Sequence, residues 1–353
     1  MHMTTEQILT AIPKLSALVL GDICLDRWST YDPAVSEPSR ETGIPRIGAI
    51  RTDVTPGAGG TVASNLAALG LQRVAVLGII GDDGFGWELS KALERRGISS
   101  DLCLRSPSLQ TFAYTKLINA ETGTEDLPRY DCINTVSLDR DLERQLLDRI
   151  QTAVDSFDVI LVSDQAETNQ GGIVTPAVRR LLADLAFRYP EKIFFADSRA
   201  RIDLFRNLVL KPNQQEAEAA CRKLFGTVDY PGLLRHVHGK LLLITQGGNG
   251  VLIVQENGES WVRTKPVKDP VDICGAGDSF SAGAALALAA THSPVAAAHF
   301  GNLVASVTIM KRGTGTASPS EILAASTRIP LVLTSEEPTG SATVPTTGSS
   351  ATA

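Results

Sequence analysis

The apolar positions of this chain follow two spacings that alternate along its length. Short, nearly continuous apolar runs bounded by turn residues predict buried strands at 15–20, 74–80, 159–162, 193–196 and 242–245. Apolar residues at helical spacing occupy stretches such as 138–154, 176–188 and 214–225. Strands that alternate with helices indicate an α/β fold with a mostly parallel sheet and helices on both of its faces.

Two segments depart from this rhythm. Residues 27–54 and 110–135 are more polar, alternate over short stretches, and contain turn residues such as Pro33, Pro38 and the run 121–123. We interpret both segments as strands that project from the main sheet and pair with each other to form a lid.

Composition indicates how the chain is divided. It has 353 residues, 43% hydrophobic and 20% charged, which is typical of a globular protein with a sizeable core. We expect one large domain over residues 1–330. The remainder, 331–353, is rich in Ser, Thr, Pro and Gly, has few apolar side chains, and is predicted to be a disordered polar tail.

Charge, apolar length and cysteine content argue against several classes of protein. A net charge of −6 without a Lys/Arg run predicts no nucleic-acid partner. The apolar stretch 282–298 is broken at residues 291–294 and predicts a buried helix pair, so no membrane association is expected. Five scattered cysteines without CxxC pairs, and an N-terminus without a signal peptide, predict reduced thiols and a cytoplasmic location.

Familiar nucleotide and metal motifs are missing from the sequence. It contains no G-x-x-x-x-G-K-[ST] loop, the glycines at 57–60 do not continue as G-x-G-x-x-G, and the five histidines are dispersed. An oxidoreductase reading would therefore rest only on α/β alternation and glycine turns.

The stretch with the clearest chemistry is DPVDICGAGDSFSAGAA, residues 269–285. Gly275, Ala276 and Gly277 form a small-residue turn that leads into an Ala-rich helix, and Asp278 lies in its first turn. Free amide groups at a helix start attract anions, and a carboxylate beside a bound anion suits a base. The turn therefore suggests phosphoryl transfer to a hydroxyl, with Asp278 accepting the proton. From these residues alone, Asp278 could equally stabilise its own helix.

Four motifs in order resemble the ribokinase-like (PfkB) carbohydrate kinase family. DICGAGDSF is similar to the family's D-x-x-G-A-G-D-x-F, KPNQQEAE to its N-x-x-E, TQGGNG to its T-x-G-x-x-G, and GDICLD to its first strand. The resemblance covers residues 15–325. It implies a three-layer α/β/α ribokinase-like fold with a mostly parallel sheet and a projecting β-sheet lid.

The resemblance also implies roles for individual residues. Asp278 would be the general base, and the backbone of Gly275, Ala276 and Gly277 would hold the transferring group. ATP and Mg²⁺ are the implied cofactors, with Glu216 organising Mg²⁺ through water. Asp272 would belong to a monovalent-cation site for K⁺, where Cys274 replaces a common Thr. The implied nucleotide-side residues are Asn213, Glu216, Thr245, Gly247, Gly250 and Asn302. Asn213 and Glu216 also have the spacing of a helix capping box, and both roles can hold at once.

The acceptor is the least defined part. The implied sugar-binding residues are Asp26, Gly57, Gly59, Thr61, Asn65, Lys116 and Arg129. SRETGIPRIGAI, TKLINA, LPRYD and VSDQA resemble the heptose 7-phosphate kinase group, and ADSRARIDLFRNLVLKPN follows that group's D-P-K segment. Thr61 stands where that group has Asn, Glu167 reverses a charge near the expected phosphates, and Arg199 replaces the Lys of D-P-K.

Three readings therefore remain open. They are a heptose 7-phosphate 1-kinase, a ribokinase- or fructokinase-like kinase of a neutral sugar, and a non-catalytic sugar- or nucleotide-binding relative. Intact Asp278 argues against the third. The expected partners are a sugar or sugar phosphate, ATP, and a second copy of the chain that pairs through the lid.

Overall fold

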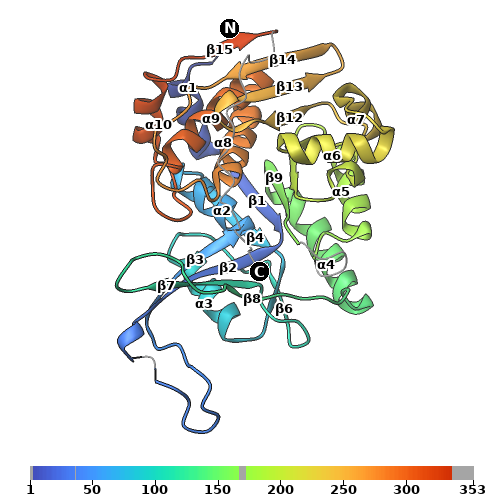
Figure 1. Ribbon diagram of the computed structural model, residues 1–353. Coiled ribbons are helices and arrows are strands. Elements are labelled where there is room, and N and C mark those ends of the chain that lie inside the picture. Colours follow the sequence, from blue (N-terminus) through green and yellow to red (C-terminus); the bar gives the residue numbers. More distant parts are fainter. Residues whose placement is uncertain (1–2, 36, 167–171, 336–353) are drawn as a thin grey trace.

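A mixed sheet forms the centre of the computed structural model, which describes residues 3–35, 37–166 and 172–335 (Figure 1). Strands β4, β1, β9, β10, β11 and β12 are parallel neighbours, and β13, β14 and β15 continue the sheet in antiparallel pairing. In spatial order the strands are β15 (Val332–Thr334), β14 (Gly258–Arg263), β13 (Val251–Gln255), β12 (Leu242–Thr245), β11 (Val209–Leu210), β10 (Ile193–Ser198), β9 (Val159–Asp164), β1 (Ser16–Gly21) and β4 (Arg73–Leu77).

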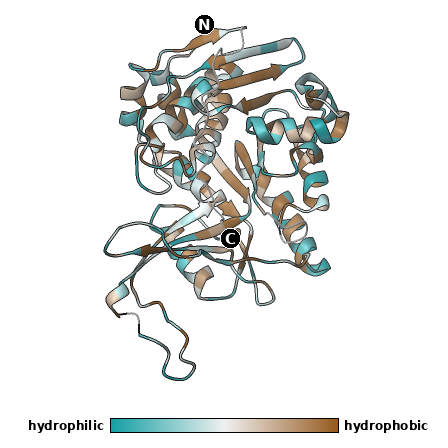
Figure 2. Cartoon of the chain, in the orientation of Figure 1, coloured by the Kyte–Doolittle hydropathy of each residue, from teal (hydrophilic) through white to brown (hydrophobic). Residues whose placement is uncertain are grey.

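Helices cover both faces of this sheet. The strands at its centre are coloured mostly hydrophobic in Figure 2, and their buried residues divide between two hydrophobic cores. Along β1, Ala17 and Val19 belong to one hydrophobic core, and Leu18 and Leu20 belong to the other. The first core is covered by α1 (Thr5–Ala11), α2 (Gly59–Ala68), α8 (Ala276–Thr291), α9 (Pro294–Thr308) and α10 (Pro319–Ser326). The second is covered by α4 (Arg140–Ala153), α5 (Pro176–Arg188), α6 (Gln214–Phe225) and α7 (Tyr230–His236). The predicted three-layer architecture is confirmed.

The apolar stretch 282–298 forms the end of α8 and the start of α9, which are mostly buried against each other and the sheet. The buried helix pair expected from the sequence is therefore present. Within the described ranges, no helix is long and apolar enough to cross a membrane.

A second, four-stranded sheet projects beside the first, and we call it the lid. Its order is β3 (Ala49–Ala58), β2 (Ile23–Tyr31), β7 (Ala113–Asn119) and β8 (Tyr130–Cys132), so both predicted lid segments pair as expected. Helix α3 (Gly84–Glu94) packs against β2 and β3. Only Asp22 separates β1 from β2, so one nearly continuous run of strand passes from the main sheet into the lid.

Some boundaries differ from the sequence expectation. Strand β2 begins at Ile23 rather than near residue 27, and the segment 55–58, expected as a turn, ends strand β3. Helix α7 and a small sheet of β5 (Ile79–Gly81) and β6 (Leu104–Ser106) were not predicted. Strand β15 pairs with β14, so a polar tail cannot begin at 331. The rest of the predicted tail, from 336 onward, lies outside the described residues.

Candidate active site

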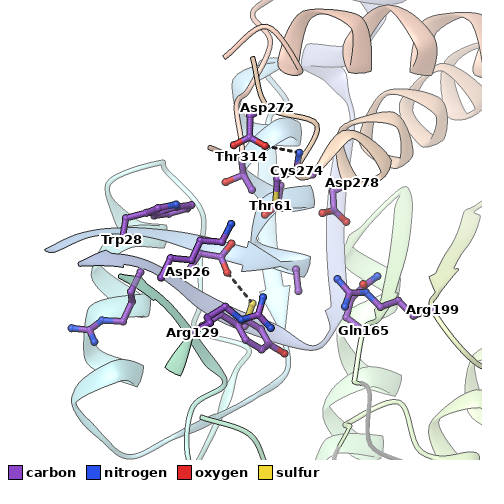
Figure 3. Close-up of a pocket in the computed structure, with 16 residues that line it drawn as sticks. Asp26, Trp28, Thr61, Arg129, Gln165, Arg199, Asp272, Cys274, Asp278 and Thr314 are labelled. Atoms are coloured by element: carbon purple, nitrogen blue, oxygen red, sulfur yellow. Dashed lines mark hydrogen bonds between the residues drawn. The ribbon is translucent and has the colours of Figure 1, made fainter. Parts of the chain in front are cut away.

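A pocket opens between the lid and the N-terminal turn of α8, at the carboxyl ends of several parallel strands (Figure 3). Ligands of open α/β sheets bind at this edge. The lining residues come from the lid strands β2, β3 and β7, the residue before β8, helices α2 and α8, the loops after β9 and β10, and the loops on either side of the α8–α9 pair. They are Cys24, Asp26, Arg27, Trp28, Ala58, Thr61, Tyr114, Lys116, Arg129, Gln165, Arg199, Asp272, Cys274, Gly275, Asp278 and Thr314.

The turn before α8 can be built only with small residues. Gly275 has φ +76°, in the left-handed region. A Cβ at this position would lie 3.2 Å from Thr61 Cγ2 and 3.3 Å from Thr314 Cγ2. The Ala276 amide donates to the Ile273 carbonyl at 3.2 Å, so it is already used within the turn. The next amides, those of Gly277 and Asp278, belong to the first turn of the helix, where intrahelical acceptors are lacking.

Asp278 projects from this turn toward the pocket, with Arg199 and Gln165 across from it (Figure 3). Desolvation by the surrounding protein raises the pKa of Asp278 from 3.8 to about 7. The Asp197 carboxylate also contributes to this rise, while Lys211 and Arg199 oppose it. A carboxyl with this pKa exchanges a proton readily near neutral pH, which suits a general base.

Asp26 occupies the lid side of the same pocket (Figure 3). Burial raises its pKa to about 6, against the lowering influence of Lys116 and Arg129. Gly57, on the neighbouring strand β3, pairs with Cys24 and lies close to this carboxylate, and a Cβ there would be 2.5 Å from Asp26 Oδ2. Glycine at 57 therefore leaves the space that the Asp26 carboxylate needs.

The lid contributes a mixed aromatic and cationic surface to the pocket. The β2–β7 register places Asp26 opposite Tyr114 and Trp28 opposite Lys116, so these four side chains share one face. Arg129 stacks over the Tyr114 ring at 5.3 Å. Two carboxylates accompany the cations: Lys116 Nζ lies 3.7 Å from Glu125 Oε2, and Arg129 Nη2 lies 2.7 Å from Asp131 Oδ2.

Of the sugar-binding residues that the resemblance implied around the start of α2, Thr61 is among those that line the pocket. It is held by a hydrogen bond from its hydroxyl to the Pro56 carbonyl at 3.3 Å. Gly59 packs against Ile23, where a Cβ would be 2.6 Å from the Ile23 Cδ1 atom. Asn65 is fully buried and donates to the Thr61 carbonyl at 3.0 Å. Asn65 is not among the residues that line the pocket, and its contact with the sugar stays a prediction.

The residues expected on the nucleotide side lie together at the ends of β11 and β12. Asn213 and Glu216 form a complete capping box at the start of α6, with hydrogen bonds of 2.9 and 2.8 Å. Asn213 also makes a bridge to Thr245. The sequence motifs N-x-x-E and T-x-G-x-x-G are therefore neighbours in space.

The glycines of the second motif are needed for its backbone. Gly247 and Gly250 have φ +53° and +99°. A Cβ at Gly250 would lie 2.2 Å from the Val262 carbonyl oxygen. Asn302, on α9, is nearly buried and donates to the same carbonyl at 3.5 Å, so its side chain supports β14.

Two carboxylates were predicted to serve cations. Both oxygens of Asp272 accept hydrogen bonds from backbone amides, Oδ1 from Cys274 at 2.9 Å and Oδ2 from Gly313 at 3.1 Å. The side chain therefore joins the two loops beside the turn 275–277 before α8, which we call the anion turn. Glu216 is the carboxylate of the N-x-x-E motif, and burial raises its pKa. The described residues hold no group of three or more His, Cys, Asp or Glu side chains suited to a metal. This donor set fits Mg²⁺ held chiefly by phosphate and water oxygens.

Sequence reasoning missed a buried ion pair behind the anion turn. Lys211 Nζ lies 2.8 Å from Asp197 Oδ2, and the Ser281 hydroxyl of α8 donates to the same oxygen at 3.2 Å. Both charged residues lie at the carboxyl ends of parallel strands, and this position in the sequence could have identified them as residues near the site. Trp28 and Tyr114 were also missed, although each lies two residues from a predicted pocket residue on the same strand. Glu167, whose charge seemed unfavourable, lies outside the described residues.

Comparison with known proteins identifies the family. The family model "pfkB family carbohydrate kinase" matches residues 49–321. "Bifunctional protein HldE" of Trichlorobacter lovleyi is 31% identical over 330 residues, which are 91% of this chain and 64% of that protein. The chain thus spans less than two thirds of the length of this relative.

Solved structures share the fold. Phosphofructokinase-2 of Escherichia coli in complex with potassium superposes with a TM-score of 0.64 at 18% identity, covering 89% of this chain and 99% of that one. Ribokinase of Arabidopsis thaliana complexed with ribose and ATP gives a TM-score of 0.62 at 17% identity, covering 88% and 98%. The ribokinase-like fold, the four motifs and the family match lead to one conclusion: this chain belongs to the pfkB family of carbohydrate kinases.

Proposed function

We propose that this carbohydrate kinase transfers the γ-phosphate of ATP to a hydroxyl of a sugar or sugar phosphate, with Asp278 as the general base. The observation that carries the proposal is the position of Asp278. Its carboxylate lies at the free first turn of α8, lines the same pocket as Asp26, and has a pKa raised to about 7.

The chain's own residues divide the work as follows. Asp26 accepts hydrogen bonds from acceptor hydroxyls and orients one of them toward Asp278. Asp278 takes the proton of that hydroxyl as the hydroxyl oxygen attacks the γ-phosphorus. The amides of Gly277 and Asp278 donate to the phosphoryl oxygens. ATP lies along the turn of Thr245–Gly250, and Mg²⁺ bound near Glu216 through water would neutralise phosphate charge.

We propose a phosphorylated sugar of the heptose 7-phosphate type as the acceptor. The support is the HldE relative together with the cations Lys116, Arg129 and Arg199 that line the pocket near Asp26. A neutral sugar is the second candidate, because Lys116 and Arg129 each lie beside a carboxylate that offsets their charge.

The test is an ADP-release assay with Mg²⁺ and ATP, run on matched phosphorylated and unphosphorylated sugars with and without K⁺. We expect turnover with a sugar phosphate, and we expect Lys116→Ala and Arg129→Ala to raise its KM while kcat changes less. Turnover of a neutral sugar with unchanged KM in both variants would assign the second candidate. Near-normal turnover by Asp278→Asn would refute the assignment of the base. A non-catalytic relative would release no ADP with any acceptor.

We further propose that the lid pairs with the lid of a second copy. The loop and strand of residues 44–50 expose Ile44 by 65%, Ile47 by 47% and Ile50 by 60%, an unusual apolar content for a projecting hairpin. A second lid placed on this surface would cover these side chains.

A further inference from the structure

Lys211 is a buried cation beside the anion turn, and the family motifs give it no role in the reaction proposed above. It follows β11 directly and is 3% exposed. Its pKa is raised: burial alone would lower it, but the charge and hydrogen bond of Asp197 outweigh burial. The ammonium therefore stays protonated.

The ammonium reaches the first turn of α8. Its Nζ lies 3.4 Å from the point that a Cβ at Gly277 would occupy, so the absence of a side chain at 277 leaves the ammonium close to the turn. Its charge also acts on Glu216 and on Asp278. The Lys211 ammonium is thus within electrostatic reach of both the carboxylate of the nucleotide motif and the proposed base, and it lies beside the turn where the phosphoryl group is proposed to bind.

The hydrogen bonds of the ammonium are incomplete. Within the described part of the chain, Asp197 is the acceptor found for Lys211 Nζ, whereas an ammonium has three N–H donors. A buried ion pair with unsatisfied donors contributes little to stability, because desolvation offsets the attraction between the charges. Such a pair gains more when an anion accepts the remaining N–H groups.

We propose that Lys211 is a further catalytic residue, whose ammonium donates hydrogen bonds to the oxygens of the phosphoryl group during its transfer, while Asp197 and Ser281 hold it in place. The proposal rests on the proposed kinase function. As the acceptor oxygen forms its bond to phosphorus, the bond from phosphorus to the leaving ADP oxygen breaks. The acceptor proton passes to Asp278, and Lys211 keeps its protons and stabilises the charge on the transferring group.

The test compares two variants that differ only at position 211. Lys211→Met alone would leave Asp197 as an uncompensated buried charge and could unfold the protein. The double variant Lys211→Met/Asp197→Asn avoids this problem because it removes both charges together. Its reference, Asp197→Asn, leaves the ammonium with an amide oxygen in place of the carboxylate, so its folding is checked by circular dichroism before its kinetics are compared. If the double variant does not fold by circular dichroism, Lys211→Gln/Asp197→Asn replaces it, since the two amide-bearing side chains can hydrogen-bond. Lys91→Met is the control, because Lys91 pairs with Glu94 at 2.7 Å on α3 and both side chains are exposed, so no buried charge is left unpaired.

The expected result is a kcat for the double variant about 10²–10³-fold below that of Asp197→Asn, the effect of removing one preorganised donor to a transition state. The acceptor KM should change little. In titration calorimetry with Mg²⁺, the ratio of ATP to ADP affinity should fall about tenfold or more, since only ATP carries the γ-phosphate. The control should match the wild type in all three measurements.

Equal kcat and equal ATP-to-ADP ratios in the two variants would overturn the proposal and leave Lys211 as the structural partner of Asp197. This failure is distinct from failure of the kinase function, which would appear as no ADP release by the wild-type protein with any acceptor.

Discussion

Replacing Asp278 by asparagine should make the protein more stable as it makes the enzyme inactive. The two side chains have nearly the same shape, but folding raises the pKa of the Asp278 carboxyl from 3.8 to about 7, chiefly through desolvation. A carboxyl that is less acidic in the folded state binds its proton more tightly there. The ionised form therefore opposes folding, and Asn removes that opposition.

The magnitude follows from the pKa. Each tenfold change in an acid dissociation constant corresponds to about 1.4 kcal/mol. The effect is absent below pH 3.8, where both states are protonated, grows as pH rises toward 7, and then stays constant at no more than about 4 kcal/mol. Because water reaches the half-buried side chain, we expect about half of this, roughly 2 kcal/mol at pH 8 and under about 1 kcal/mol at pH 5.

The assay is urea unfolding of wild type and Asp278→Asn at pH 5 and pH 8, with an ADP-release measurement on the same samples. Asp184→Asn is the matched control, since Asp184 is an exposed carboxylate on α5. We expect Asp278→Asn to stabilise the protein more at pH 8 than at pH 5, and turnover to fall by about two or more orders of magnitude. A stability gain that is equal at both pH values, or that shrinks as pH rises, would refute the reasoning.

The remaining predictions concern pH, the nucleotide turn and the lid. In a pH profile of the wild-type enzyme, kcat/KM should fall about tenfold for each pH unit below about pH 7, because the base must lose its proton to act and the pKa of Asp278 is raised to about 7. A flat profile down to pH 5 would contradict this expectation. Gly250→Ala should lower the melting temperature and weaken ATP binding, because φ is +99° and a Cβ would lie 2.2 Å from the Val262 carbonyl oxygen. The control is Gly70→Ala, where φ is +86° but nothing lies within 4 Å of the Cβ, so the difference between the two variants isolates the effect of the steric clash. Ile50→Glu should convert the proposed dimer to monomer in light scattering after size-exclusion chromatography, and an unchanged mass would place the interface elsewhere.

Local patterns were sufficient for most of the fold. Apolar runs such as 159–162 and 193–196 predicted buried strands, and these strands pair as neighbours in the sheet. Helix ends were equally readable, since Asn213 and Glu216 have capping-box spacing and do cap α6. Strand β15 could not be found this way. Its three residues become a strand only because β14 offers a free edge, which is a property of the folded sheet.

The site could be predicted where a reactive side chain and a glycine turn lie within a few residues of each other in the sequence. The turn at Gly275 and the carboxylate of Asp278 lie in one short stretch of sequence. The partners of Lys211 do not: Asp197 and Ser281 come from β10 and α8, and only the folded sheet brings them together. The burial of Asn65 could not be foreseen for a related reason, since a resemblance places a residue type at a position without showing its surroundings in the fold.

The single residue between β1 and β2 limits how this lid can be exchanged in protein engineering. Asp22 accepts the amides of Gln165, Ala166 and Ile173 at 2.8, 2.8 and 3.0 Å, and a Cβ on the preceding Gly21 would lie 2.0 Å from the Ser163 carbonyl oxygen. A lid transplanted from another sugar kinase must therefore keep this joint, because a misplaced junction would break the packing of the main sheet. Chimeras that cross after Asp22 and before Gly59 would retain the native anchor while exchanging β2 and β3, provided that the core side chains of Ile23 and Leu25 are kept.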